Sequence, residues 1–231
     1  MTNRSHFASP FFGFLRELAA NNRREWFLTN KQHYEREVRE PLSSFIADFA
    51  PRLRKINSHY VADPSSNGGS MFRIYRDVRF SPEKQPYKTH AAAHFRHVMG
   101  KDVHAPGYYL HLEPRNVFFA AGMWSPDPRS LAKVRDAIVA SPKRWRRAIG
   151  DRAFAGACTL EGDRLSRPPK SYDPNHPLIE ELKRKDFIAY SRTHLRERDA
   201  LSAEFIDRFA DFCAAAAPLM RFLTEAVGLK W

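Results

Sequence analysis

Cysteine is scarce in this sequence, since only Cys158 and Cys213 occur among its 231 residues. Two thiols exclude a disulfide-stapled scaffold and any zinc site that needs three or four thiolates. Long apolar runs are also lacking, because the best two, 117–124 and 214–220, fall far short of the roughly 18 residues that indicate a membrane-spanning helix. The start of the chain has no charged and then apolar segment of the kind that marks a signal peptide. We therefore expect a protein of a reducing compartment, the cytoplasm, with no membrane partner.

Acidic residues are too few to balance the basic ones. The chain has 38 Lys and Arg against 26 Asp and Glu, a formal net charge of +12, and 27 of the cations are arginines. The planar arginine fork matches phosphate and carboxylate groups, so this balance favours phosphate-bearing molecules or nucleic acid as partners. An arginine-rich codon bias would give the same count without any function. Contents of 43% hydrophobic and 13% aromatic residues exclude a disordered chain.

The spacing of apolar residues predicts helices first and strands after them. The region 10–56 has apolar residues at helical spacing, with a kink or a break expected near Glu40 because Pro41 follows it. Aromatic and β-branched residues bounded by Gly, Pro and Asn then predict strands. These predicted strands are 71–75, 91–98, 107–113 and 116–123.

Helices are expected again from residue 127 onward. An irregular, proline-rich stretch is expected over 158–177, and 186–192 is a candidate additional strand. Pro218 is expected to begin a second C-terminal helix. Strands gathered between helices predict an α+β fold with a central, mainly antiparallel sheet of about four to five strands. The expected layout is a single domain over 1–231, divided into a helical region 10–56, a sheet 71–124, helices with an irregular segment 127–185, and C-terminal helices 196–228.

Basic residues gather in the segment 71–89, which holds five cations and only two anions. Several charge-assisted hydrogen bonds, each contributing about 1.5–3 kcal/mol, are enough to hold a phosphate. Here Arg and Lys would bind phosphate or carboxylate, Asp77 would orient a guanidinium, and Tyr87 would supply a ring or a hydroxyl. The predicted ligand-binding residues are Arg73, Arg76, Asp77, Arg79, Lys84, Tyr87, Lys88 and, from a later strand, His111.

The order of residues over 76–89 is Arg-Asp-x-Arg-Phe-Ser-x-x-Lys-x-Pro-Tyr-Lys-Thr, which resembles a widespread bacterial and fungal family known only as a conserved domain of unknown function. The resemblance implies that this motif is the signature of the family, and it implies no reaction. Glu83 stands where the family pattern has Asp, which keeps the charge. The other segments that fit the family are the helices that carry Phe14 and Trp26, the stretches Gly107–Glu113 and Gly122–Trp124, and the helix Leu131–Ile138.

Histidines cluster directly after this motif, with five of the ten between 90 and 111. On a strand, His90 and His94 share one face while His97 lies on the other, so the three do not converge on one ion. Neither an H-E-x-x-H nor a C-x-x-C motif is present. The sequence therefore predicts no metal site.

His111 is the one histidine with a candidate chemical role. It shares a strand face with Tyr109 and Glu113, and that face would adjoin Arg73, which makes His111 a candidate acid or base. A structural histidine is the alternative. The sequence has no G-x-S-x-G, no Walker A motif and no glycine-rich loop that opens a helix. Catalysis and cofactor therefore stay open.

Three functional hypotheses follow from these patterns. The first is the binding of a small phosphate- or carboxylate-bearing ligand by the segment 71–89. The second is nucleic-acid binding through a wider basic surface, because 143–147 and 164–172 interleave cations with aromatic residues. The third is a purely structural motif, in which Asp77 and Glu83 pair with neighbouring cations in exposed pairs worth only about 0–1 kcal/mol. The oligomeric state is left open.

Overall fold

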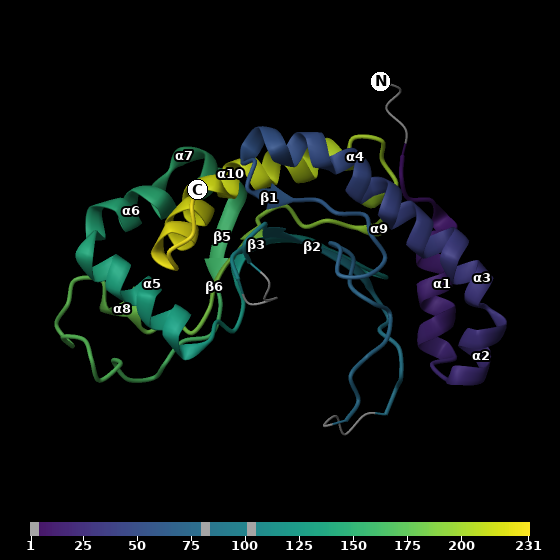
Figure 1. Cartoon of the computed structure of the whole chain (residues 1–231), viewed down its shortest axis with the longest axis horizontal. Helices are drawn as coiled ribbons and strands as arrows, with labels where there is room; N and C mark the ends of the chain where they lie inside the picture. The colour runs from purple at the N-terminus through teal and green to yellow at the C-terminus, as the bar shows by residue number, and fades with distance from the viewer. Residues whose placement is uncertain (1–4, 80–83, 101–104) are drawn as a thin grey trace.

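The computed structural model describes residues 5–79, 84–100 and 105–231, in which helices pack on one antiparallel sheet (Figure 1). Within these residues the sheet has six strands in the order β1-β2-β3-β4-β6-β5, and each neighbouring pair is antiparallel. The α+β class is confirmed, with one strand more than the upper expectation. The strands are β1 (Tyr60–Val61), β2 (Ala91–His97), β3 (Gly107–Glu113), β4 (Asn116–Met123), β5 (Cys158–Glu161) and β6 (Phe187–Ser191).

The helices lie before, between and after the strands. They are α1 (Ser9–Ala20), α2 (Arg24–Thr29), α3 (Lys31–Tyr34), the π-helical turn η1 (Glu35–Arg39), α4 (Glu40–Ile56), α5 (Pro128–Ala140), α6 (Pro142–Gly150), α7 (Arg152–Ala157), α8 (Ile179–Leu182), α9 (Glu197–Ala200) and α10 (Phe205–Ala226). The break expected near Glu40 takes the form of η1, which relaxes the helix directly before Pro41. None of the helices in the described residues has the length and apolar character that crossing a membrane requires.

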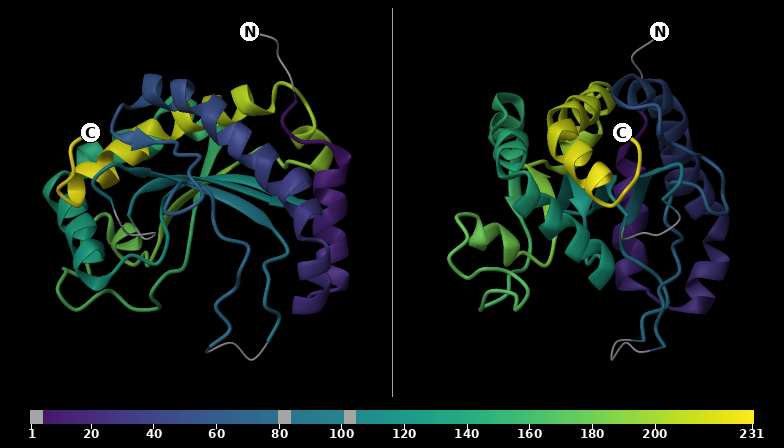
Figure 2. Two further views of the ribbon diagram at one scale, coloured as in Figure 1. Left: turned by 45° about the vertical axis from the view of Figure 1, so that its right-hand side comes forward. Right: turned by 60° about the vertical axis from the view of Figure 1, so that its left-hand side comes forward.

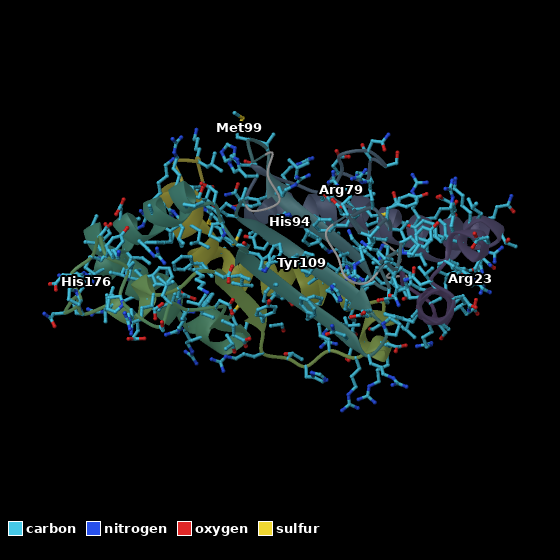
Figure 3. All side chains as sticks on the ribbon, turned by 90° about the horizontal axis from the view of Figure 1, so that it is seen from below. Arg23, Arg79, His94, Met99, Tyr109 and His176 are labelled. Atoms are coloured by element: carbon cyan, nitrogen blue, oxygen red, sulfur yellow. The ribbon has the colours of Figure 1, made fainter. Side chains whose placement is uncertain are left out.

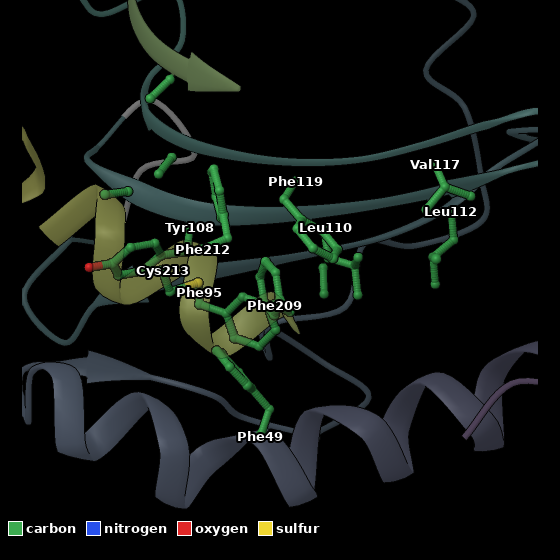
Figure 4. Close-up of a cluster of buried hydrophobic side chains, with 14 of the residues drawn as sticks. Phe49, Phe95, Tyr108, Leu110, Leu112, Val117, Phe119, Phe209, Phe212 and Cys213 are labelled. Carbon is green, nitrogen blue, oxygen red and sulfur yellow. The ribbon is translucent and has the colours of Figure 1, made fainter. Parts of the chain in front are cut away.

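One face of the sheet is covered by α4 and α10, which lie across it (Figures 1 and 4). Alternate residues of β3 point to this side, and Leu110 lies opposite Phe119 of β4 in the register. The ring of Phe209 on α10 lies 4.8 Å from the ring of Phe49 on α4 and 4.9 Å from that of Phe119. Burial of each such aromatic side chain contributes about 1.5–3 kcal/mol, so this face is the core of the protein and closed to ligands.

The strand expected over 71–75 is absent from the sheet. After Met71, which forms a single bridge with Ala93 of β2, the chain leaves the sheet and pairs with its own continuation. We call residues 71–79 and 84–90 the arm. It projects from the sheet on the side opposite α10 (Figure 2). Its own pairing comprises the bond from Arg76 N to Pro86 O at 2.9 Å, the bond from Lys88 N to Ile74 O at 2.8 Å, and a bridge between Tyr75 and Tyr87.

Two further expectations about the second half need correction. The stretch 158–177, expected to be irregular, begins with strand β5, which pairs with β6 at the far edge of the sheet. Pro218 does not begin a helix but lies inside α10, which runs without interruption. Proline costs a helix about 3 kcal/mol, and the burial of twelve α10 side chains on both sides of Pro218 offsets that cost. The additional strand expected over 186–192 is present as β6.

Candidate functional site

The second face of the sheet carries aromatic and polar side chains rather than an aliphatic layer. Strand alternation places His94 of β2, Tyr109 of β3 and Tyr190 of β6 on this face, and Figure 3 shows His94 and Tyr109 on it from below. A hollow of about 320 Å³ lies here, which we call the aromatic hollow. It is lined by Phe72, His94, Gly107, Tyr109, Phe118, Ala120, Ala121, Gly122, Trp124, Ile188 and Tyr190.

Small residues form the floor of the aromatic hollow and aromatic rings form its walls. Gly107 pairs with Gly122 across β3 and β4. A Cβ atom on Gly107 would overlap the imidazole of His94, so glycine is what allows this ring to lie over β3. The His94 ring lies nearly parallel to that of Phe72, with centroids 6.2 Å apart. Flat walls over a floor without side chains fit a planar group that stacks on aromatic rings.

A row of three polar side chains follows β3 away from the floor. The Tyr109 hydroxyl lies 2.9 Å from Nδ1 of His111, and Nε2 of His111 lies 3.3 Å from Oε2 of Glu113. Glu113 also accepts hydrogen bonds from Thr89 and Asn116, both at 3.1 Å. We call Tyr109, His111 and Glu113 the β3 polar row. Every member has a hydrogen-bond partner, so the row holds a fixed geometry.

Burial sets the protonation of the β3 polar row. Burial lowers the pKa of His111 below its ordinary value, although the hydrogen bond to Glu113 opposes this. Burial also raises the pKa of Tyr109. For Glu113, burial acts to raise the pKa, but hydrogen bonds from Asn116, His111 and Thr89 outweigh it and leave the pKa below its ordinary value. At neutral pH the row is therefore a phenol, a neutral imidazole and a carboxylate.

His90 lies against the row from the last residue before β2. Its ring centroid is 4.5 Å from that of His111. Burial, followed by the effect of His111, lowers the pKa of His90 to about 4. His90 is therefore uncharged across the physiological pH range.

Acidification is expected to destabilise the protein through His90. The unfolded state takes up a proton on this imidazole near pH 6.5 and the folded state only near pH 4, so the free energy of unfolding falls as the pH drops between these values. Allowing for screening of the partly exposed ring, we expect a loss of about 2 kcal/mol. Denaturant unfolding of wild type and His90→Phe at both ends of this window measures it. If the two proteins lose stability equally on acidification, this account of His90 is wrong.

Two cations lie beside Phe72, whose ring lines the aromatic hollow, and we call Arg73 and Lys88 the rim cations. The Lys88 ammonium lies 5.1 Å from the centre of the Phe72 ring, and burial, followed by the nearby Arg73, lowers the pKa of Lys88. Arg73 lines an adjoining hollow of about 200 Å³ together with Phe72, His94 and Arg96. Among the residues that the structure describes, neither rim cation forms an ion pair with a carboxylate.

The other charged residues of the predicted site lie farther out on the arm. The Arg79 guanidinium makes two hydrogen bonds to Asp77, at 2.7 and 3.0 Å, in an exposed ion pair. The Lys84 ammonium donates to the carbonyl oxygen of Val78 at 3.2 Å. Arg76 is held in the pairing of the arm through its backbone. The predicted cations are therefore divided between the rim of the hollow and the outer arm, while Phe80, Ser81, Pro82 and Glu83 of the motif fall outside the described residues.

Tyr87 anchors the arm to the helices. Its ring stacks on that of Phe27 in α2 at 4.1 Å and is 3% exposed. The Asn22 side chain donates to the Tyr87 carbonyl at 2.9 Å and accepts from its backbone N–H at 3.1 Å. The Tyr87 ring is thus packed in the core, and it is absent from the lining of the aromatic hollow.

Of the two other basic segments, 143–147 lies on α6 and 164–172 is a loop between β5 and α8 (Figure 1). Trp145 is fully buried, so its ring is closed to a nucleobase, and Arg144 forms an ion pair with Glu225. The Tyr172 hydroxyl donates to Asp136 at 2.9 Å. These contacts give the aromatic residues of both segments structural partners.

The histidines that the structure describes do not converge on one metal site. His97 faces the opposite side of the sheet from His94, and its Nε2 lies 2.9 Å from the carbonyl oxygen of Lys230. Over the ranges 5–79, 84–100 and 105–231, no three His, Cys, Asp or Glu side chains are placed to hold a metal ion. His104 lies outside those ranges.

The aromatic hollow itself was not predicted from the sequence. Arg73, Lys88 and His111 were predicted as ligand-binding residues. Phe118, Tyr190 and the small residues of the floor were not. A signal was present, because glycine inside a strand, as at Gly107 and Gly122, indicates a close approach of other groups to the backbone.

A comparison with known protein families identifies the family of this chain. A family model described as "Conserved hypothetical protein (DUF2461)" matches residues 10–222. The chain belongs to this family. The match runs from α1 into α10 and so includes the arm, the sheet and the aromatic hollow, which confirms the resemblance to a family of unknown function. Neither the curated proteins nor the solved structures yield a match to this DUF2461 chain.

Proposed function

We propose that this DUF2461 protein binds a small anion that carries a planar group. In this proposal the phosphate or carboxylate contacts the rim cations, Arg73 and Lys88, and the planar group lies in the aromatic hollow. The observation that carries the proposal is the position of Lys88, a half-buried ammonium 5.1 Å from the centre of the Phe72 ring that lines the hollow, with no carboxylate paired to it in the described residues.

Burial of a charge without a partner is unfavourable, and proteins tolerate it chiefly where it serves binding or catalysis. A bound anion would supply the missing partner of Lys88. One charge-assisted hydrogen bond to an ammonium contributes about 1.5–3 kcal/mol, and Arg73 nearby adds a second attraction to the same anion. Stacking against aromatic side chains adds about 0.5–1.5 kcal/mol beyond the burial of area.

Nucleic-acid binding receives no comparable support. The basic segments that suggested it have their aromatic residues buried or hydrogen-bonded, as Trp145 and Tyr172 show. The exposed cations of the arm include Arg79, whose charge is balanced by Asp77. The hollow is a small, partly open recess of about 320 Å³, a size that suits one planar group better than a continuous strand.

A binding panel tests the proposal. Phenyl phosphate, inorganic phosphate and a single-stranded oligonucleotide are each added to the protein, and melting temperature and calorimetric affinity are measured. We expect phenyl phosphate to raise the melting temperature more than inorganic phosphate does, because the ring adds contacts that phosphate alone lacks. At about 100 times its Kd, phenyl phosphate should add about 2.7 kcal/mol to the free energy of unfolding.

The dependence on salt separates the alternatives. Binding of one small anion should give a log–log slope of about one or less in magnitude, whereas single-stranded nucleic acid contributes about 0.7 for each phosphate neutralised. Tight, steeply salt-dependent binding of the oligonucleotide, or no stabilisation by phenyl phosphate, would contradict the proposal.

A further inference from the structure

The hydrogen bonds within the β3 polar row have the arrangement of a catalytic site, in addition to any role in ligand binding. We propose that Tyr109, His111 and Glu113 form a catalytic triad, in which the Tyr109 oxygen is the nucleophile, His111 is the base and Glu113 positions the base. The chemical class of substrate is a small anionic ester with a planar group. This inference rests on the proposed function for the position of the substrate, and its test is designed to fail separately from anion binding.

The geometry meets the requirement for an activated nucleophile. The Tyr109 oxygen lies 2.9 Å from Nδ1 of His111, and the other ring nitrogen of His111 lies 3.3 Å from Glu113. This sequence of nucleophile, base and orienting carboxylate is the common pattern of covalent catalysis. Glu113 is itself fixed by Thr89 and Asn116, so the carboxylate cannot turn away from His111.

The three residues also lie in the order that catalysis requires. Tyr109 lines the aromatic hollow, whereas His111 is 7% exposed and lies behind it. A ligand in the hollow therefore meets the phenol first and the base only through the phenol. Regular alternation along β3 produces this order, because residues 109, 111 and 113 share one face of the strand.

The tautomer of His111 follows from its two neighbours. A carboxylate only accepts hydrogen bonds, so Nε2 of His111 carries the hydrogen and donates it to Glu113. Nδ1 is then free of hydrogen and accepts from the Tyr109 hydroxyl. Burial keeps the Tyr109 pKa high, so the phenol reacts only if its proton is removed as it attacks, and the imidazole of His111 is uncharged and able to take that proton.

The step conserves atoms and electrons without an oxidant or reductant. The Tyr109 oxygen forms a bond to the ester carbonyl carbon, while the Tyr109 proton passes to Nδ1 of His111. The bond from the carbonyl carbon to the leaving oxygen then breaks, and that oxygen keeps the electron pair and receives the proton from His111. Water then attacks the acyl carbon while His111 takes a proton from the water. The bond from the acyl carbon to the Tyr109 oxygen breaks, and that oxygen keeps the electron pair and receives the proton from His111, which restores the phenol and releases the acid.

Covalent labelling tests the triad without knowledge of the natural substrate. The probe is 4-(fluorosulfonyl)benzoate, which joins a ring and a carboxylate to an electrophilic sulfur. Attack by the Tyr109 oxygen forms an oxygen–sulfur bond and expels fluoride, and the proton passes to His111. We expect peptide mass spectrometry to find Tyr109 labelled at least tenfold faster than Tyr190, the other tyrosine that lines the hollow.

Variants separate the roles of the three residues. We expect His111→Gln to slow the labelling of Tyr109 by about 100-fold, the usual scale for loss of a general base. Glu113→Gln should slow it by a smaller factor and shift its pH profile, because the carboxylate orients the imidazole. The matched control is His176→Gln, a substitution of the same kind at a histidine far from the hollow (Figure 3), which should leave labelling within about twofold of wild type.

The pH dependence of the rate at which Tyr109 is labelled in the wild-type protein is a test that needs no variant. The titratable and charged groups that face His111 are Tyr109 and Glu113 from its own strand and His90 from the segment before β2, while its neighbour on β4 is the uncharged Phe118. Because the His111 pKa lies below its ordinary value, the labelling rate of Tyr109 should be half-maximal below about pH 6.5 and level above it. A tyrosine that reacts only as phenolate, such as Tyr190, should instead gain about tenfold in rate for each pH unit.

Binding and catalysis can fail independently in this design. The unreactive analogue 4-sulfamoylbenzoate measures anion binding, and the neutral benzenesulfonyl fluoride measures the reactivity of Tyr109 without an anion. If the analogue binds but Tyr109 is no faster than Tyr190, or its rate is unchanged in His111→Gln, the triad is overturned while anion binding stands. If the analogue does not bind but the neutral probe labels Tyr109 with the expected pH profile, the proposed function fails and the triad stands.

Discussion

Replacing Gly122 with alanine is expected to lower the free energy of unfolding by more than about 3 kcal/mol. Gly122 has φ +137°, which an L residue with a side chain adopts only under strain. A Cβ atom there would also overlap the carbonyl oxygen of Phe187 on β6. Because this neighbour is backbone, β4 and β6 must separate to make room, which breaks the pairing at one side of the aromatic hollow. Chemical denaturation of the purified variant measures the loss.

Gly13→Ala is the matched control for Gly122→Ala. Gly13 lies in α1 with open space around the position of a Cβ atom. Alanine in a helix is favoured over glycine, so this variant should be more stable than wild type by about 0.5–1 kcal/mol. A Gly122→Ala protein as stable as wild type would contradict the close approach of β4 and β6 at the hollow.

The central strands could be predicted from the sequence because local patterns specify them. Strands expected over 107–113 and 116–123 are found as β3 and β4 with the same bounds. Alternating aromatic and aliphatic residues bounded by turn residues set both ends, and Arg115, at φ 67°, forms the tight turn between them.

The structure of the arm could not be predicted because it depends on which segments of the chain pair with the edge of β2. The composition of 71–75 is that of a strand, but the open edge of β2 is shared between β1 and the short bridge at Met71. The remainder of the segment therefore pairs with residues 86–88, and Tyr87 fixes it to α2. Tertiary context decides such cases over local preference.

The candidate site could be predicted in part, for a related reason. Lys88, Arg73 and His111 were expected near one another from charge and strand alternation. Which face of the sheet α10 would cover is a tertiary property, so the open face with Phe118 and Tyr190 was not evident. The pairing of Asp77 with a neighbouring cation was one of the alternatives, but the sequence alone does not show that this cation is Arg79 and that Lys88 has no such partner among the described residues.

Replacing Lys88 with methionine is expected to weaken the binding of phenyl phosphate by about 10- to 100-fold. The change removes one charge-assisted hydrogen bond of about 1.5–3 kcal/mol, and each 1.4 kcal/mol corresponds to about tenfold in Kd. Methionine is unbranched and only one atom shorter than lysine, so it keeps most of the packing on Phe72. Titration calorimetry of the variant and wild type at one ionic strength measures the difference.

For the stability of the same variant we expect no loss, in contrast to the loss of binding. Because burial disfavours the charged form of Lys88, the variant should be at least as stable as wild type while it binds less well. Arg79→Met is the matched control, since it removes one cation from the same arm, where Arg79 is exposed and paired with Asp77. It should bind phenyl phosphate within about twofold of wild type. Equal loss in both variants would mean that the arm acts through its total charge and not through the rim of the hollow.

The position of a bound anion tests the account most directly, and a crystal structure of the protein with phenyl phosphate would measure it. We expect the phosphate within hydrogen-bonding distance of the Lys88 ammonium and the phenyl ring over Ala120, between the aromatic walls. A phosphate held by Arg76 or Arg79 on the outer arm, with the aromatic hollow empty, would show that the open face of the sheet is not the binding site.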